Sequence, residues 1–420
     1  MNRQLSEHQL AQMQHVQWWS LLAGIVALAI CVLGAIFDPD QFFRAYLAAY
    51  QFYLGLALGS FVVVMIYHLT GGAWGFLIQR ILEAAMRTIP YLAVLFIPLA
   101  FGLGSLYLWA NPDEVAADKE LQHKQIYLNV PFFLIRAAIF FALWTAFAWV
   151  LDRWSRRQDE TGDERYAERQ ATLSGPGLIV FGISITFAGV DWLMSLQPHF
   201  RSTIYGPLIV TGQILSGHAV ALIMLAWLAP HPPFTEALKS DAPSEQDGIN
   251  GVVSPKALND LGNLLFTFLI LWAYMVWFQF MLIWIANFPY EVIWYLPRSR
   301  GGWQWVAYTL LVFHFIIPFS LLLSRDLKQH LPTLAKIAGL ILATHLAYVY
   351  YLVMPSFPDS TILEHWMDFV MPIGIGGLWL WSFLHELKRR PLLARQPEDR
   401  AEALHLRKLD EEAARRPLEA

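Results

Sequence analysis

Residues 46–69, YLAAYQFYLGLALGSFVVVMIYHL, contain no Asp, Glu, Lys or Arg. A membrane core about 30 Å thick is crossed by about 20 helical residues, so this stretch is long enough to span a bilayer. Nine other stretches share its length and apolar character. The ten predicted spans cover residues 15–37, 46–69, 89–110, 127–151, 173–196, 205–229, 261–287, 303–324, 330–353 and 365–387. The sequence therefore predicts an all-α polytopic membrane protein with about ten transmembrane helices.

The overall composition supports this fold class. Of the 420 residues, 56% are hydrophobic and only 15% are charged, against about 25% charged in a typical soluble domain. The strands of a transmembrane β-barrel alternate over about ten residues, a pattern that these long apolar stretches do not follow. The formal net charge of −4 gives no reason to expect a nucleic-acid partner. With Cys31 as its one cysteine, the chain offers no cysteine-based metal site, and we expect no bound metal.

The chain divides into three predicted segments. Residues 1–14 form a polar N-terminal tail, residues 15–387 form the transmembrane domain, and residues 388–420 form a C-terminal tail. The C-terminal tail alternates acids and bases at helical spacing, which predicts a solvated helix. No cleavable signal peptide is apparent. The sequence has no Walker A, G-x-G-x-x-G or EF-hand motif, so any catalysis must come from the membrane domain or from partner subunits.

The distribution of basic residues predicts the orientation in the membrane. Ten spans place both termini on one side. That side receives 21 of the 29 Lys and Arg residues, the other side receives six, and two lie within spans. Because Lys and Arg are enriched in the cytoplasmic loops of membrane proteins, we expect both termini in the cytoplasm.

Ionisable residues inside the spans mark the first candidate site, because a charge within a bilayer costs a few kcal/mol. Asp191 lies near the outer end of the fifth span, and Arg136 lies about nine residues inside the fourth span at a comparable depth. A structural salt bridge between them and a proton-transfer role for Asp191 are both open, since buried pairs often only fix geometry. A third interpretation of Asp191 is a helix-end carboxylate that reaches headgroup water.

Further polar residues lie near the two membrane surfaces. His365 and Asp368, three residues apart at the outer start of the tenth span, either extend the outer group or belong to a wet helix start. The inner surface has His68, Glu83, Lys336 and Glu386. Glu83 belongs to the amphipathic stretch WGFLIQRILEAAMRTIP (residues 74–90), which leaves open whether it is buried or lies at the interface. The long stem of Lys336 can carry its charge to the interface.

Three histidines, His218, His314 and His345, fall near the middle of their spans. An isolated histidine in a membrane commonly hydrogen-bonds to a neighbouring helix, and its near-neutral pKa suits proton relay. No two of them are spaced i, i+4 on one helix, and haem ligation between helices is left open. The inner, central and outer groups form three layers that predict a proton path. Its candidate residues are Asp191, Arg136, His68, Glu83, His218, His314, Lys336, His345 and Asp368.

Glycines predict close packing between helices. Gly55 and Gly59 form a G-x-x-x-G pattern, which lets helix backbones approach each other. The second and sixth spans run in the same direction and contain similar glycine-bearing stretches, YLGLALGSF and VTGQILSGH. This similarity predicts a same-direction repeat in which spans two to five correspond to spans six to nine.

Several motifs together resemble a known family. They are YHLTGGAWG (67–75), RILEAA (80–85), YLNVPFFLIR (127–136), DWLMSLQPHFRSTIYG (191–206), LNDLGNLLFTFLILWAYMVWFQFMLIWIANFPYE (258–291) and SRDLKQH (324–330). They look like the NrfD/PsrC-type membrane subunits of bacterial alternative complex III, of the ActF type, over nearly all ten spans. Phe200 stands where that family has a tryptophan, and residues 288–291 vary a family pattern rich in Ile, Pro and Glu.

The resemblance implies two four-helix bundles with flanking single helices, in the bacterial plasma (inner) membrane. It implies a subunit of a respiratory or photosynthetic quinol:electron-acceptor oxidoreductase that is not catalytic alone. Quinone or menaquinol is the expected small ligand, and haem c and iron–sulfur clusters are expected in partner subunits. The expected partners are a sibling NrfD-type subunit, an iron–sulfur subunit, c-type haem subunits, small helical membrane subunits, and a periplasmic cytochrome c or copper protein reached through them.

Two alternatives stay open. A quinol-binding membrane anchor of a polysulfide- or DMSO-reductase-type complex has the same general fold. A secondary transporter would place Gly- or Pro-broken helices at matching positions of inverted halves, whereas the repeat predicted above is parallel. Within the resemblance, Asp191, Arg136, His68 and Glu83 fall in matching motifs, while the other candidate residues are supported by their depth.

Overall fold

The computed structural model describes residues 7–230, 255–358, 360–362 and 365–393. Every regular element in these residues is helical, and none of them is a β-strand. The first part of the chain forms α1 (Glu7–Ala35), α2 (Pro39–Thr70), α3 (Ala73–Met86), α4 (Ile89–Phe101), α5 (Leu103–Leu106), η1 (Leu108–Ala110), α6 (Pro112–Ala117), α7 (Lys119–Lys124), α8 (Val130–Thr161), α9 (Arg165–Trp192) and η2 (Met194–Leu196). The second part forms α10 (Tyr205–Leu228), α12 (Pro255–Ala286), α13 (Pro289–Val292), α14 (Tyr295–Arg298), α15 (Trp303–Thr309), η3 (Leu310–Ile316), α16 (Ile317–Leu322), α17 (Arg325–Gln329), α18 (Leu331–Val353), η4 (Met354–Ser356) and α19 (Met367–Leu387).

Ten helical segments of the described chain are long and apolar enough to cross a membrane. They cover Leu10–Ala35, Pro39–Thr70, Trp74–Phe101, Val130–Thr161, Arg165–Leu196, Tyr205–Leu228, Pro255–Ala286, Trp303–Leu322, Leu331–Ser356 and Met367–Leu387. The predicted all-α polytopic fold with ten spans is therefore confirmed. The solvated helix predicted for the C-terminal tail falls mainly in residues 394–420, outside the described residues.

The third span differs most from its predicted position. It is formed by α3 and α4 together, from Trp74 to Phe101, and not by residues 89–110. The amphipathic stretch is the first half of this span, and the chain bends between the helices at Arg87 and Thr88. The charged residues of α3 lower its hydropathy, so a search for apolar runs starts the span too late.

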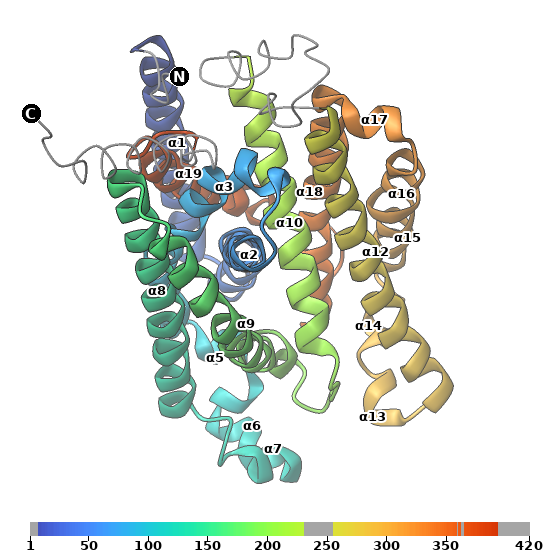
Figure 1. Cartoon of the computed structure of the whole chain (residues 1–420). Coiled ribbons are helices and arrows are strands. Elements are labelled where there is room, and N and C mark those ends of the chain that lie inside the picture. The colour runs from blue at the N-terminus through green and yellow to red at the C-terminus, as the bar shows by residue number, and fades with distance from the viewer. Residues whose placement is uncertain (1–6, 231–254, 359, 363–364, 394–420) are drawn as a thin grey trace, which may run out of the picture.

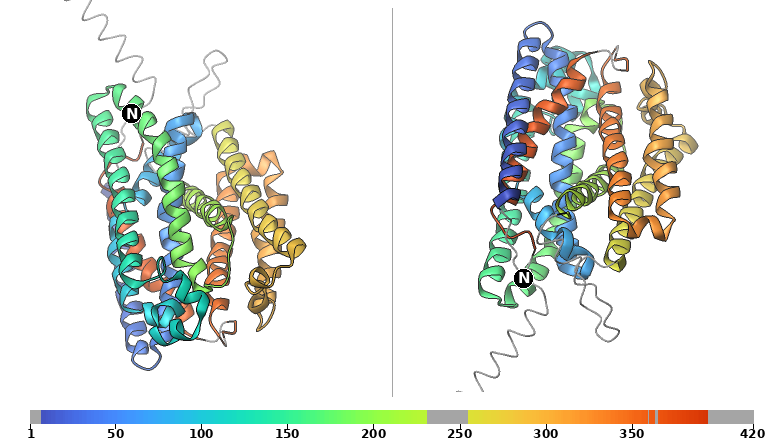
Figure 2. Two further views of the ribbon diagram at one scale, coloured as in Figure 1. Left: turned by 90° about the horizontal axis from the view of Figure 1, so that it is seen from below. Right: turned by 90° about the horizontal axis from the view of Figure 1, so that it is seen from above.

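Eight of the ten spans form two bundles of four (Figures 1 and 2). We call α2, α3–α4, α8 and α9 the first bundle, and α10, α12, α15–η3–α16 and α18 the second bundle. In Figure 2, α8 and α9 (green) lie on one flank and α12 and α15–α16 (yellow to orange) lie on the other, with α2 and α10 between them. Helices α1 and α19 pack along each other, and α19 also packs on α2. We call the end where α1 begins and α19 ends the terminal side, and the end with α6, α7 and α13 the opposite side (Figure 1).

The two bundles meet where α2 crosses α10, and glycines make this crossing possible. A Cβ atom on Gly59 would lie 1.7 Å from the carbonyl oxygen of Gln213. On the other helix, a Cβ atom on Gly217 would lie 2.5 Å from the backbone nitrogen of Ser60. Backbone therefore rests on backbone, as small residues allow in membrane helices. The close packing predicted for this glycine pattern is confirmed.

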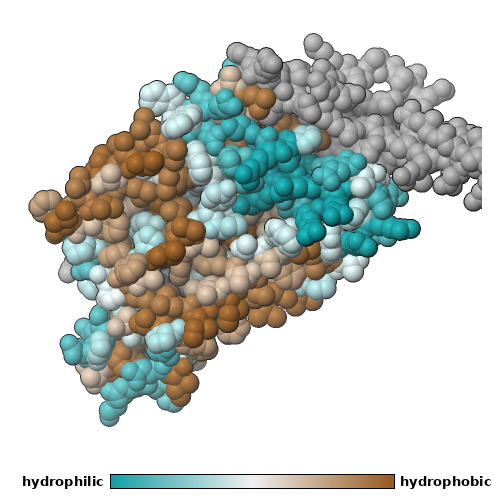
Figure 3. Space-filling view, turned by 90° about the vertical axis from the view of Figure 1, so that its left-hand side faces the viewer, coloured by the Kyte–Doolittle hydropathy of each residue, from teal (hydrophilic) through white to brown (hydrophobic). Residues whose placement is uncertain are grey.

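The outer surface carries a broad apolar region between hydrophilic ends (Figure 3). Large apolar side chains on α1, α12 and α15–α16 face outwards; Trp18, Trp277 and Trp305 are each more than 60% exposed. Soluble proteins rarely expose an apolar surface of this extent to water, whereas the hydrocarbon core of a bilayer accommodates it. The structure is that of a multi-pass membrane protein.

The α2–α10 crossing gives a test of the fold. Gly59→Ala should lower the stability by about 1–3 kcal/mol or more, because the added methyl group forces the two backbones apart. Gly339→Ala in α18 is the matched control, since a Cβ atom there meets nothing within 4 Å. Thermal unfolding in detergent, followed by tryptophan fluorescence, should show a lower midpoint for the first variant only. Equal midpoints would contradict the crossing.

Candidate functional site

Buried and half-buried charges on the terminal side form one connected group. We call it the terminal-side network; its members come from α3, α8 and α19 with the residues that follow α19. They are Arg80, Glu83, Arg87, Asp152, Asp159, Glu386 and Arg390. Ion pairs of 2.5 to 3.8 Å join them into a single cluster.

Glu83 lies at the centre of this network. The sequence left open whether it is buried or lies at the interface, and in the structure it is buried. Its Oε2 atom accepts hydrogen bonds of 2.6 Å from Arg80 and from Arg390. Its Oε1 atom accepts from Gln79 at 2.8 Å and from Ser155 at 2.9 Å. Two cations and two neutral donors hold one carboxylate, so Glu83 is fixed as an anion between three helices. This geometry is that of a structural brace.

Sequence reasoning overlooked most of this network. Arg80 and Arg87 stand three residues before and four residues after Glu83, the spacing that places side chains on one helix face. That spacing was a usable signal for a charged face on α3. The partners Asp152 and Asp159 in α8 had no such signal, because which face of α8 turns towards α3 depends on the packing. Burial lowers the pKa of Arg390, and Glu83 and Asp152 oppose this effect.

On the opposite side, Arg136 and Asp191 form a two-point ion pair. The Nε and Nη2 atoms of Arg136 donate to the two carboxylate oxygens of Asp191 at 2.6 and 3.0 Å. The Nη1 atom of Arg136 donates to the Tyr127 carbonyl at 2.9 Å, and the guanidinium lies 3.9 Å from the Tyr127 ring centre. Asp191 is fully buried. The structure thus pairs these residues and rules out a carboxylate in headgroup water.

The space between these two charged groups in the first bundle is filled by aromatic rings. Trp192 is the centre of this aromatic core. Its ring lies 5.1 Å from Phe96, 5.7 Å from Phe141 and 5.9 Å from Trp144, measured between ring centres. The indole nitrogen of Trp144 donates to Ser184 at 2.8 Å. Stacked and edge-to-face rings of this kind make a rigid apolar core.

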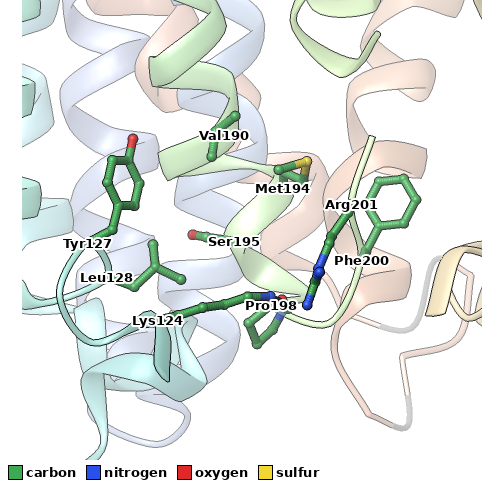
Figure 4. A pocket seen from close by; sticks show the side chains of 9 residues that line it. All are labelled: Lys124, Tyr127, Leu128, Val190, Met194, Ser195, Pro198, Phe200 and Arg201. Carbon is green, nitrogen blue, oxygen red and sulfur yellow. Dashed lines mark hydrogen bonds between the residues drawn. The ribbon is translucent and has the colours of Figure 1, made fainter. Parts of the chain in front are cut away.

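A pocket of about 200 Å³ opens on the opposite side next to the Arg136–Asp191 pair (Figure 4). It is lined by Lys124, Tyr127, Leu128, Val190, Met194, Ser195, Pro198, Phe200 and Arg201. Asp191 is not part of the lining, although Val190 and Ser195 on either side of it are. The lining is mostly apolar, and its charged groups stand at the rim.

The rim of the pocket is held by Glu120 of α7. Lys124, His199 and Arg201 contact its carboxylate at 2.8, 3.0 and 2.6 Å. Hydrogen bonds from these three side chains, that of Lys124 first, hold the pKa of Glu120 well below its usual range. Lys124 also donates to the Pro198 carbonyl. The loop after η2 is therefore bonded to α7 through these contacts.

The second bundle contains a different set of polar residues at mid-depth. His314 and His345 stack with ring centres 5.7 Å apart. Trp272 packs on His314 at 4.2 Å, and Tyr348 packs on His345 at 5.6 Å. Thr344 lies 2.7 Å from the Nδ1 atom of His314. The two predicted central histidines thus come together from different helices.

Each of these two rings keeps one nitrogen without a protein partner among the described residues. These nitrogens are Nε2 of His314 and Nδ1 of His345, and both side chains are buried. Buried polar atoms are nearly always hydrogen-bonded in proteins. Both nitrogens are therefore available to water or to a small ligand inside the bundle.

His314 lies on a π-helical segment, η3. Pro318 has no N–H group to donate to the His314 carbonyl four residues earlier. The Ile317 N–H instead bonds to the Val312 carbonyl, five residues earlier. This wider turn follows from the sequence HFIIP, and such segments occur often at functional sites.

Polar residues extend this centre in both directions along α12. On the terminal side, the Nε2 atom of His218 lies 3.1 Å from the Leu261 carbonyl, and Lys328 donates to the Asn263 side chain at 2.6 Å. Towards the opposite side, Gln279 is buried. With 1.5 Å of rise per residue, Asn263 and Trp272 are roughly 14 Å apart along α12, and Trp272 and Gln279 roughly 10 Å. We call the following set the polar file: Lys328, Asn263, His218, His314, His345, Tyr348 and Gln279.

The remaining predicted residues lie apart from this file. His68 contacts Ser174 of α9 through Nδ1 at 3.2 Å. Lys336 is exposed on α18, as expected for a lysine that reaches towards the interface. Asp368 accepts from Gln41 at 2.8 Å, which ties α19 to α2. His365 precedes α19 and accepts the Met367 N–H, so it does not share a helix face with Asp368.

The predicted proton-path residues therefore fall into separate groups. His218, His314 and His345 share the second bundle, whereas Glu83 and the Arg136–Asp191 pair close the two ends of the first bundle. Among the described residues, no group of three or more His, Cys, Asp or Glu side chains is placed to hold a metal ion. No protein-family model matches this sequence, and no curated protein matches it.

The Arg136–Asp191 pair gives a direct test. Asp191→Asn or Arg136→Gln alone should cost about 3–5 kcal/mol, because each leaves the partner charge buried and unpaired. The double variant should lose clearly less than the sum of the two, with a coupling energy of about 0.5–3 kcal/mol. Unfolding titrations in mixed detergent micelles would measure all four proteins. Additive losses would show that the pair is not an energetic unit.

Proposed function

We propose that this chain is an integral membrane subunit of a quinol:electron-acceptor oxidoreductase of the alternative complex III type, and that its second bundle carries protons. The motifs shared with NrfD-type subunits support the first part. The observation that carries the second part is the buried His314–His345 pair, which stands at mid-depth with a free nitrogen on each ring. An imidazole can accept a proton on one ring nitrogen and donate a proton from the other, which is what a relay group needs.

The polar file supports transfer over most of the membrane depth. Protons would enter from the terminal side past Lys328 and Asn263, pass His218, and reach the His314–His345 pair. The side chains along α12 extend over roughly 24 Å of a core about 30 Å thick. Short chains of water between these groups complete such a path in membrane proteins.

The first bundle has a scaffolding role in this proposal. Its aromatic core contains no chain of polar groups along which a proton could move. Its buried charges form ion pairs at the two ends of the bundle. Asp191 is bonded at both oxygens by Arg136, so it serves better as a brace for the opposite surface than as a base for quinol. In this arrangement the pocket beside it is part of the quinol-side scaffold.

The sidedness follows from the basic residues. With the terminal side in the cytoplasm, the pocket and the Glu120 cluster face the periplasmic side of a bacterial plasma membrane. The partners with iron–sulfur clusters and haem c would dock there, and quinol electrons would leave through them. Purification under mild conditions tests the assembly, since co-isolation with haem- and iron–sulfur-containing polypeptides is expected, whereas purification from native membranes without any such polypeptide would contradict it.

The central histidines give the test of the proton path. His345→Phe and His314→Phe should each lower the number of protons released per electron during quinol oxidation, while the electron-transfer rate in uncoupled vesicles stays within about twofold, because the histidines are not part of the electron path. Vesicles with a pH-sensitive dye and a limiting amount of quinol measure this ratio. His330→Asn is the matched control, since His330 is exposed at the terminal side and its ring hydrogen-bonds with Thr333. An unchanged ratio in both variants would refute the path.

A further inference from the structure

Arg298 is a buried cation near the opposite-side end of the polar file. Its side chain is 1% exposed, and it belongs to α14, which follows α12 and α13. Nε donates to the Tyr351 carbonyl at 3.1 Å and Nη1 to the Trp294 carbonyl at 2.6 Å. Nη2 donates to the Leu352 carbonyl at 2.7 Å and to the Ser356 hydroxyl at 3.2 Å.

Neutral groups satisfy this guanidinium. Its four hydrogen bonds go to three carbonyls and a hydroxyl, and its carbon lies 3.6 Å from the Trp294 ring centre. No described Asp or Glu forms an ion pair with it. The buried Arg80 and Arg136, by contrast, each face a carboxylate. The charge of Arg298 is therefore not neutralised by a counter-ion within the described residues.

The carbonyls that bind Arg298 explain why a cation is tolerated there. Tyr351 and Leu352 are in the last turn of α18, where backbone carbonyls have no helical partner. The C-terminal end of a helix also carries a partial negative charge that favours cations. Burial lowers the pKa of Arg298 to about 10, and four nearby tyrosines counteract this. The side chain is thus positively charged at neutral pH.

Its position places this charge beyond the last groups of the file. Tyr348 stands one helical turn before the two carbonyls that Arg298 binds, and Tyr295 of α14 packs against Phe280, the neighbour of Gln279. Tyr205, Tyr295, Tyr348 and Tyr351 lie close enough to the guanidinium to affect its pKa. A proton that leaves His345 towards the opposite side would therefore approach a fixed positive charge.

Anion binding is the other use for a buried arginine, and the geometry argues against it. A guanidinium has five N–H groups, and four hydrogen bonds already occupy its three nitrogens. An oxyanion needs two parallel donors for a strong complex. Arg298 offers a fixed charge and no free fork.

We propose that Arg298 is an electrostatic barrier that closes the opposite-side end of the polar file to protons. Fixed arginines exclude protons and cations from narrow membrane pores in the same manner. The inference rests on the proposed proton path and adds its direction. Protons enter the file from the terminal side, and without turnover they do not pass through to the opposite side. Release towards the opposite side then requires a change that neutralises or moves this charge.

Two kinds of variant remove the barrier. Arg298→Gln deletes the charge but also weakens the clamp on α18. Ser356→Asp keeps Arg298 and places a carboxylate where Nη2 now meets the Ser356 hydroxyl, so it neutralises the charge and preserves the clamp. Arg298→Lys retains the charge, and Ser356→Asn retains the shape of the aspartate without its charge. These two are the matched controls.

The full chain, reconstituted into liposomes with a trapped pH dye and given a pH step, provides the measurement. Wild type, Arg298→Lys and Ser356→Asn should be tight. Ser356→Asp and Arg298→Gln should leak protons about tenfold faster, the effect of one unit charge roughly 12 Å away across an effective dielectric of about 20. Adding His345→Phe to Ser356→Asp should abolish the leak, because the file is then interrupted.

Several results would overturn the barrier. A tight Ser356→Asp protein refutes it, and so does a Ser356→Asn protein that leaks as fast. A leak that survives His345→Phe does not run through the file and also refutes it. The proposed proton path has its own failure, an unchanged proton yield in the His314→Phe and His345→Phe complexes. A lowered proton yield with a tight Ser356→Asp chain would leave the path standing and remove the barrier alone.

Discussion

The crossing of α2 and α10 at Gly59 and Gly217 is the constraint on which the rest of the structure depends. These two helices are the most buried of the spans, and every other span of the two bundles packs on one of them or on a helix that does. With backbones in contact, the two bundles cannot slide relative to each other without a clash. The position of α18 follows from the same contact, since Gly212 of α10 leaves room for the His345 ring.

Buried charge is the second constraint, and the two bundles meet it in different ways. The first bundle pairs each buried arginine with carboxylates. Close geometry and full hydrogen bonding then offset the free energy that is lost when these charges leave water. The second bundle uses amides, carbonyls and aromatic rings around Lys328 and Arg298. Paired charges make a rigid brace. The charge of Arg298, which has no counter-ion among the described residues, keeps an electric field inside the protein.

Much of the fold was predictable because bilayer thickness acts on sequence directly. The number of spans, the glycine contact and the same-depth pairing of Arg136 with Asp191 follow from lengths and positions along the helices. The terminal-side network did not follow, because the rotation of α8 against α3 is set by packing and not by residue spacing. The predicted start of the third span is too late for a related reason. Arg80 and Glu83 give α3 the sequence pattern of a surface helix, and only the packing shows that their charges are paired and buried. Arg298 lies between two predicted spans, and nothing in its neighbourhood of sequence shows that the end of α18 covers it.

The parallel repeat predicted from the glycine-bearing stretches gives these differences a common frame. Helix α2 packs on α3–α4 and α9 of its bundle, and α10 packs on α12 and α18 of its own, which is the pattern that such a repeat predicts. In the first bundle the interior holds Trp192, Phe141 and Trp144, rings that admit no chain of polar groups. In the second bundle it holds His314, His345 and Tyr348, and the missing N–H of Pro318 widens the helix that presents one of them. The same helical frame thus yields one bundle with an aromatic interior and ion pairs at both ends and one whose interior is polar, and the difference lies in the side chains that fill them.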